Sequence, residues 1–231
     1  MLVAWKRHIL HRDGVCVIPR LVPEGIVTDF ALIADLIYER LGRATDFQTD
    51  EDIVLRDNLR GWRGVWFAGL TKYLARNDSG LAGRLTATLT AIEARCLAYL
   101  PPGWRLCTER SFFRRHLADV PSYTRWHMDA DAARTLDVAP EATNFWLPFD
   151  AVRKTAPSLE FVVGSHLELR GAEQIRDPTV ERPLVGGRHI APVLRPGGAA
   201  VFSHFTLHRT QQLRMRGDRR TSAELRFVQG V

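Results

Sequence analysis

The sequence predicts an α+β fold, in which a double-stranded β-helix (a jelly-roll or cupin-like core) carries N-terminal helices packed on one of its two sheets. Two observations indicate this. Apolar side chains recur at helical spacing through the first hundred residues. Residues 104–228 instead contain short runs of β-branched and aromatic side chains separated by Gly, Pro and Asp turns. Helices followed by antiparallel strands are typical of this fold class.

The N-terminal part is expected to be mainly helical, with one short strand over Val15–Pro19. Pro23 and Glu24 are typical of the first turn of a helix, and Pro101 to Gly103 end the last helical pattern. Residues 43–62 are polar without a clear period, which predicts a loop that could act as a lid over a site. The expected helices are Val3–His11, Ile26–Leu41, Val65–Leu74 and Leu81–Leu100.

Strands are expected in the C-terminal part, and no repeat or linker interrupts it. We therefore predict a single domain over residues 1–231, in which residues 1–103 support a β-helix core formed by residues 104–231. The expected strands are Trp104–Leu117, Thr143–Val152, Leu159–Val163, His189–Leu194, Ala199–Leu207 and Thr221–Val228.

The composition is that of a soluble protein, with 45% hydrophobic and 25% charged residues. No apolar run is long enough for a membrane span, no secretion signal is recognisable, and the three cysteines lack metal-ligand spacing; these features favour the cytoplasm. The net charge of +6 comes almost entirely from scattered arginines, which argues against nucleic-acid binding and favours a small-molecule substrate with an anionic group. The oligomeric state is left open.

The candidate site begins at His127 and Asp129. Two residues apart on an extended strand, their side chains leave the same face. Together with a distant histidine such as His208, they would form the two-histidine, one-carboxylate ligand set of non-haem Fe(II) oxygenases. A His-x-Asp tripeptide also occurs by chance, and taken alone it would indicate only two solvated side chains at the end of a strand.

Further motifs follow in a definite order and spacing. They are Trp126 to Asp129, Trp146-Leu147-Pro148, Val163 to His166, Phe202 to His208, and Arg220 to Phe227. Taken together, these motifs resemble the phytanoyl-CoA dioxygenase family of Fe(II)- and 2-oxoglutarate-dependent oxygenases. The resemblance covers roughly the second half of the chain.

The resemblance implies that His127, Asp129 and His208 bind Fe(II), and that 2-oxoglutarate and O2 are co-substrates. His204 competes with His208, but the family places its ligand at the end of the strand, which selects His208. His166 is not expected to be a ligand. Family positions that line the co-substrate correspond to Trp146 and Thr210, and Asn144 shares a strand face with Trp146.

In this family an arginine binds the far carboxylate of 2-oxoglutarate. Its planar, permanently charged fork matches a carboxylate in a bidentate manner. Counting back from Arg226 and Phe227, the strand register of the family favours Arg220 for this role, and counting forward from His208 favours Arg219. Adjacent strand residues point to opposite faces, so only one of the two can serve, and we prefer Arg220.

The reaction expected from the resemblance is hydroxylation, or another oxidation, of an unactivated C–H bond in a small molecule or natural product, with release of succinate and CO2. Asp129 occupies the position at which related halogenases carry a small residue. The alternative is a non-redox cupin-like metal-binding protein or a metal-dependent hydrolase or isomerase, which would not need Arg220. Candidate substrate-binding residues are Arg114, Arg115 and Trp62, although solvated arginines on an outer strand face explain Arg114 and Arg115 better, and an exposed loop is the plain alternative for Trp62.

Overall fold

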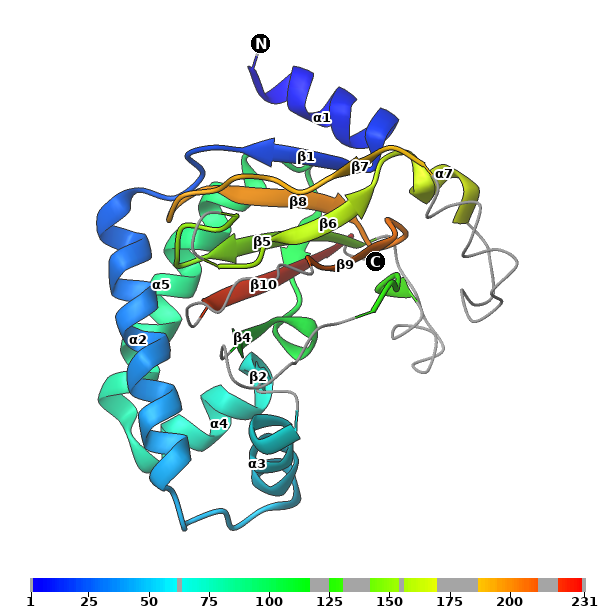
Figure 1. Cartoon of the computed structure of the whole chain (residues 1–231). Helices are drawn as coiled ribbons and strands as arrows, with labels where there is room; N and C mark the ends of the chain where they lie inside the picture. Colours follow the sequence, from blue (N-terminus) through cyan, green and yellow to red (C-terminus); the bar gives the residue numbers. More distant parts are fainter. Residues whose placement is uncertain are drawn as a thin grey trace.

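The computed structural model describes residues 2–61, 64–116, 125–130, 142–153, 156–169, 187–211 and 220–229. These residues form two antiparallel sheets and a set of helices that lie mainly on the outer side of the larger sheet (Figure 1). The larger sheet has seven strands in the order β1-β8-β5-β10-β4-β2, with β3 also paired to β10. The smaller sheet has three strands in the order β7-β6-β9. This arrangement confirms the predicted α+β fold with N-terminal helices.

The elements have the following bounds. The helices are α1 (Leu2–Asp13), α2 (Glu24–Arg43), α3 (Asp50–Gly61), α4 (Phe67–Asn77), α5 (Ser79–Leu97) and α7 (Ser165–Leu169), with a 3-10 turn at Thr108–Arg110. The strands are β1 (Val15–Ile18), β2 (Gly64–Trp66), β3 (Trp104–Leu106), β4 (Phe112–His116), β5 (Ala142–Pro148), β6 (Leu159–Val162), β7 (His189–Ile190), β8 (Ala199–Ser203), β9 (His208–Thr210) and β10 (Arg220–Gln229). No helix of the described part is long and apolar enough to cross a membrane.

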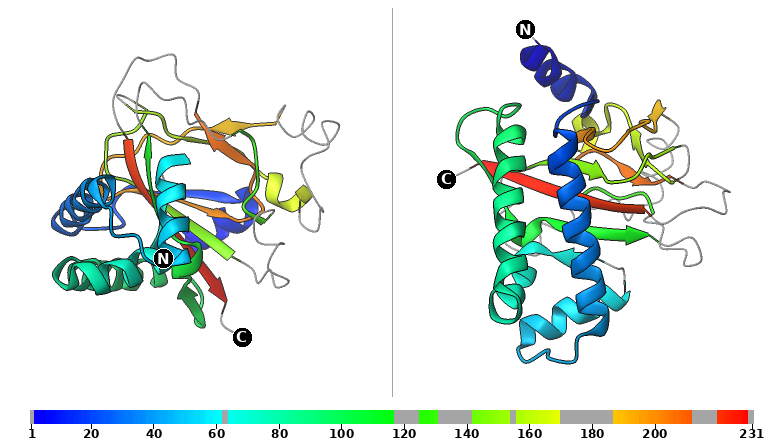
Figure 2. Two further views of the ribbon diagram at one scale, coloured as in Figure 1. Left: turned by 90° about the horizontal axis from the view of Figure 1, so that it is seen from below. Right: turned by 90° about the vertical axis from the view of Figure 1, so that its left-hand side faces the viewer.

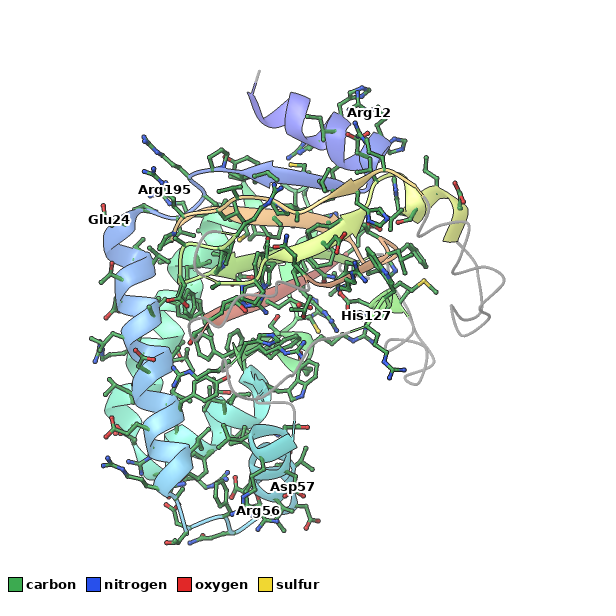
Figure 3. All side chains as sticks on the ribbon, in the orientation of Figure 1. Arg12, Glu24, Arg56, Asp57, His127 and Arg195 are labelled. Carbon is green, nitrogen blue, oxygen red and sulfur yellow. The ribbon has the colours of Figure 1, made fainter. Side chains whose placement is uncertain are left out.

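The predicted loop over residues 43–62 is wrong, because helix α3 occupies Asp50–Gly61. Its first turn is capped reciprocally: the amide of Asp52 donates to the Thr49 hydroxyl, and the amide of Thr49 donates to the Asp52 carboxylate. Asp52 is buried and also bonds Arg76 of α4, so the helix is held against the helical layer. Figure 3 shows Arg56 and Asp57 of this helix well away from His127.

Three of the expected strand and helix boundaries also differ. The helix expected from Val65 begins at Phe67, because Gly64–Trp66 pairs with β4. The 3-10 turn divides the strand expected over Trp104–Leu117 into β3 and β4. The strand expected over Ala199–Leu207 ends at Ser203, and after a turn the chain continues in the smaller sheet as β9.

The main core lies between the larger sheet and helices α2, α4 and α5. Figure 2 shows α2 and α5 side by side across the outer face of this sheet. Phe30 of α2 is fully buried against Phe113 of β4 and Phe149, with ring centroids 4.8 and 5.2 Å apart. Burying one such side chain contributes roughly 1.5–3 kcal/mol, so this layer is a rigid support for the strands.

Strand β10 divides its two faces between support and site. Ala223, Leu225 and Phe227 are fully buried in the helix-facing core. The alternate residues Arg220 and Arg226 point to the other face, towards the smaller sheet, as does Trp146 of the neighbouring β5. The space between the two sheets therefore receives charged side chains from a strand whose outer face packs three apolar side chains into the helix-facing core.

Candidate metal centre

His127, Asp129 and His208 come together between the two sheets. Each offers a ligand atom, and the three atoms lie within 4.8 Å of one another. His127 pairs antiparallel with His208 through two backbone hydrogen bonds of 3.0 Å, which attach the 125–130 segment to β9. Nε2 of His127 lies 3.8 Å from Oδ1 of Asp129, and Nε2 of His208 lies 3.8 Å from Oδ2 of the same carboxylate. Donor atoms at these separations can converge on one metal ion.

Both imidazoles are oriented for ligation through Nε2. Nδ1 of His127 lies 2.8 Å from the carbonyl oxygen of Arg125, and Nδ1 of His208 lies 2.9 Å from that of Thr206. A carbonyl oxygen can only accept, so each Nδ1 carries the proton and donates it. This leaves the lone pair of each Nε2 directed at the cluster, as is usual for metal-binding histidines.

The electrostatics favour the protonation states that metal binding requires. Burial and the neighbouring His208 lower the pKa of His127 to about 4, and burial lowers the pKa of His208 as well. Burial alone would raise the pKa of Asp129, but the charge of Arg226 holds it below its usual value. At neutral pH the cluster therefore contains two neutral imidazoles and one carboxylate.

Asp129 accepts a hydrogen bond on each of its oxygens. The Arg226 guanidinium donates to Oδ1 at 2.7 Å, and the Asn144 amide donates to Oδ2. The same Arg226 nitrogen donates to Glu224 at 2.9 Å. Arg226 and Asn144 face each other in the β10–β5 register, so the sheet places both donors on the same side of Asp129.

Arg226 and Glu224 were not predicted as site residues. Arg226 served only as a marker for counting back to Arg220. The signal was present in the alternation of β10, where the polar residues Arg220, Ser222, Glu224 and Arg226 alternate with the apolar residues Ala223, Leu225 and Phe227. Charged side chains on the buried face of a strand indicate a polar site next to that face.

His204 and His166 are held by other contacts. Nδ1 of His204 lies 2.7 Å from the carbonyl oxygen of Ala142, and Nε2 of His166 lies 2.9 Å from the carbonyl oxygen of His11. Among the described residues only His127, Asp129 and His208 form a cluster of three potential ligands. The preference for His208 over His204 agrees with this geometry.

The residues expected around the co-substrate lie in one neighbourhood. The Arg220 guanidinium is buried 5.2 Å from the Trp146 ring centroid and donates to the carbonyl oxygen of Pro157 at 2.6 Å. Thr210 is fully buried and pairs with Leu159, which follows Pro157 by two residues. Arg219 lies outside the described residues, so its competing assignment stays a prediction.

Two of the candidate substrate-binding residues, Arg114 and Arg115, lie on opposite faces of β4. Arg114 lies on the face of β4 that points into the space between the sheets, opposite Ser222 of β10. Arg115 points the other way, where it bonds Asp35 and stacks 4.0 Å from the Tyr38 ring centroid of α2. The suggestion that Arg115 binds substrate is therefore corrected, since adjacent strand residues face opposite sides. Trp62 lies outside the described part of the chain.

Comparison with known proteins decides the family. The family model for phytanoyl-CoA dioxygenase (PhyH) matches residues 10–221. The chain belongs to this family. Its members are Fe- and 2-oxoglutarate-dependent oxygenases, so iron and 2-oxoglutarate are the cofactor and co-substrate of this chain, and the His-Asp-His cluster is the matching metal site. Comparison with curated protein sequences gives no match.

Solved structures of the same fold include three enzymes or enzyme complexes. The non-haem α-ketoglutarate-dependent epimerase SnoN from nogalamycin biosynthesis has a TM-score of 0.65 at 16% identity, over 98% of this chain and 82% of SnoN. EvdO2 from Micromonospora carbonacea var. aurantiaca, complexed with 2-oxoglutarate, gives 0.63 at 18% identity, over 98% and 90%. EctD from S. alaskensis, with 2-oxoglutarate and 5-hydroxyectoine, gives 0.65 at 14% identity, over 97% and 75%. At these identities the likeness shows the fold alone.

Proposed function

We propose that this oxygenase hydroxylates an unactivated C–H bond of a small molecule, with conversion of 2-oxoglutarate and O2 to succinate and CO2. The observation that carries the proposal is the arrangement of His127, Asp129 and His208, whose ligand atoms lie within 4.8 Å of one another. Two imidazole nitrogens and one carboxylate suit Fe(II) and leave positions for other ligands. A metal-dependent hydrolase or isomerase has no observation in its favour.

The donor set fits iron in its chemistry. His127 and His208 present neutral Nε2 atoms because each Nδ1–H is bonded to a backbone carbonyl oxygen, and Asp129 presents an ionised carboxylate. When bound here with 2-oxoglutarate and O2, iron supplies the oxidation of the substrate C–H bond. The protein supplies the orientation of the reactants, with Asp129 and His208 buried and His127 partly exposed.

Arg220 is the proposed partner for the far carboxylate of 2-oxoglutarate. Its side chain is 1% exposed, so its charge acts in a medium of low polarity and attracts a carboxylate strongly. Trp146 forms one wall beside it, and Thr210 lies at the end of the strand that carries His208. Asn144, which was expected to line the co-substrate, instead contacts the proposed ligand Asp129.

The substrate is proposed to be a compact molecule with an anionic group. Arg114 and His116 lie on the site-facing side of β4, and burial, together with the positive charges of Arg220 and Arg114, lowers the pKa of His116. A site with this positive charge attracts anions. Relatives of this fold act on natural products or contain 5-hydroxyectoine, and they include an epimerase and a carbocyclase. Abstraction of hydrogen without hydroxylation is therefore the second outcome to test for.

The first test uses anaerobic protein with Fe(II) and 2-oxoglutarate. We expect the weak visible charge-transfer band of the iron–2-oxoglutarate chelate, and thermal stabilisation by the two ligands together. Asp129→Ala should abolish both and stop succinate formation in air. The matched control is Asp52→Asn, a change at another buried aspartate that lies in the helical layer. Normal succinate formation by Asp129→Ala would refute the metal assignment.

A further inference from the structure

The buried charges next to the proposed iron ligand form a chain that runs from Glu224 through Arg226 to Asp129. One nitrogen of Arg226, Nη2, donates to Oδ1 of Asp129 at 2.7 Å and to Glu224 at 2.9 Å. The side chains of Arg226 and Glu224 are 10% and 11% exposed, and that of Asp129 is 6% exposed. Solvent therefore screens these interactions little.

Stability alone does not account for this arginine. Replacing a buried ion pair by apolar side chains is often neutral or stabilising, because removing charges from water is costly. Arg226 also leaves its Nε buried without a hydrogen-bond partner among the described residues. A methionine at this position could pack against Phe112, whose ring centroid lies 5.7 Å from the guanidinium carbon, without that cost. The contacts that an apolar side chain could not replace are those with Asp129 and Glu224.

Those contacts limit how Asp129 can bind a metal. A carboxylate has about four lone-pair positions, two on each oxygen. Arg226 takes one position on Oδ1, and Asn144 takes one on Oδ2. With an N–H donor on each oxygen, the carboxylate cannot rotate about its Cβ–Cγ bond without breaking one of these bonds. Its orientation relative to His127 and His208 is therefore fixed before a metal binds.

We infer that Arg226 is a positioning residue, which with Asn144 fixes the orientation of the Asp129 carboxylate for metal binding and is itself anchored by Glu224. The inference rests on the proposed function. Side chains that orient a ligand in this way strengthen metal binding, because the ligand is already placed when the ion arrives. The backbone fixes the anchor as well, because the Arg226 amide donates to Ser111 Oγ at 2.9 Å, and its carbonyl oxygen accepts from Cys107.

The test measures metal binding rather than turnover. Metal-free protein is titrated with Co(II), followed by its visible absorption, and the anaerobic Fe(II)–2-oxoglutarate band is recorded separately. Arg226→Met should raise the Co(II) Kd about 10- to 100-fold, the range expected for loss of a side chain that orients a ligand. The Fe(II)–2-oxoglutarate band should shift or broaden. Arg226→Lys retains the charge without the planar fork and should restore the Kd only in part.

The direction in which the Co(II) Kd changes distinguishes a positioning role of Arg226 from a purely electrostatic one. If Arg226 acted only as a nearby positive charge, its removal would strengthen binding of a divalent cation. Tighter or unchanged Co(II) binding by Arg226→Met would therefore overturn the inference. If that variant does not fold, Glu224→Gln tests the same chain from its other end. It should raise the Kd by a smaller factor, and an unchanged Kd would overturn the anchoring role.

The matched control is Arg76→Met. Arg76 also binds a buried aspartate, Asp52, at 2.6 Å, but in the helical layer. This variant should lower the Tm and leave the Co(II) Kd and the iron band unchanged. Wild-type protein that binds neither Co(II) nor Fe(II) with 2-oxoglutarate would contradict the proposed function itself. Wild-type binding with no effect of Arg226→Met contradicts only the role of Arg226.

Discussion

Removing the arginine proposed to bind 2-oxoglutarate tests the arrangement of the whole site. In Arg220→Met the buried guanidinium is replaced by an apolar side chain of similar length beside Trp146. The far carboxylate of 2-oxoglutarate would then lose its charged partner in a site where water cannot take its place. We expect weaker 2-oxoglutarate binding with little change in Fe(II) binding, because the metal ligands are on other elements.

The size of the effect follows from the contacts of Arg220. Its Nη1 donates to the carbonyl oxygens of Pro157 at 2.6 Å and Ser158 at 3.5 Å, so this nitrogen is engaged in holding the side chain. We therefore count one charge-assisted hydrogen bond from the remaining N–H groups to 2-oxoglutarate. Such a bond contributes about 1.5–3 kcal/mol, which corresponds to an increase in Kd of about 10- to 150-fold.

The assay is titration of the anaerobic Fe(II) protein with 2-oxoglutarate, followed by the visible charge-transfer band. Arg220→Lys keeps the charge but not the planar fork, so its Kd should lie between those of wild type and Arg220→Met. Arg219→Met serves as the comparison variant. An unchanged Kd in Arg220→Met, together with a large increase in Arg219→Met, would refute the choice of Arg220. The Tm of each variant, measured without ligands, separates loss of folding from loss of binding.

Two further predictions concern stability. Burial would raise the pKa of Asp52, but two backbone amides and Arg76 hold it below its ordinary 3.8. The stabilisation from its ionised form is therefore complete above pH 3.8 and is lost as the pH falls through the lower folded-state value. Asp52→Asn should cost about 1–3 kcal/mol at pH 7 by urea unfolding and less at pH 3. Equal losses at both pH values would contradict this reading. Gly14→Ala should destabilise the protein by about 2 kcal/mol in the same assay, because φ at Gly14 is +74° and an added Cβ would lie 2.4 Å from His166. Gly83→Ala is the control, because a Cβ at Gly83 meets nothing within 4 Å, and this variant should be neutral or stabilising.

Periodicity was sufficient to predict most of the fold. Helices α2 and α5 present apolar side chains at helical spacing because each buries one face on the larger sheet, and the sequence records that burial directly. Helix α3 was missed because only Asp52 and Leu55 are buried among its twelve residues, so it has no continuous apolar stripe. Its signal lay in the cap formed by Thr49 and Asp52, which periodicity does not detect.

The metal cluster could be predicted only in part from local sequence. The spacing of His127 and Asp129 is visible in the chain, but His208 joins them only because the chain leaves the larger sheet after Ser203 and enters the smaller one. A continuous strand would have kept His204 and His208 on one face, with no local basis for choosing between them. The order of several motifs, compared with a known family, supplied the choice that local sequence could not.

The inner face of β10 then explains why one strand carries so much of the site. Arg220 and Arg226 are six residues apart, which places their backbone atoms about 20 Å from each other along an extended strand. One guanidinium lies beside Trp146 and the other bonds Asp129, so the two positive charges serve different groups between the sheets. Both are fixed by a strand whose other face is buried against the helices. A one-residue slip of β10 would move both arginines into that apolar core, so the register that packs Leu225 and Phe227 also sets the spacing between the proposed co-substrate anchor and the metal ligand.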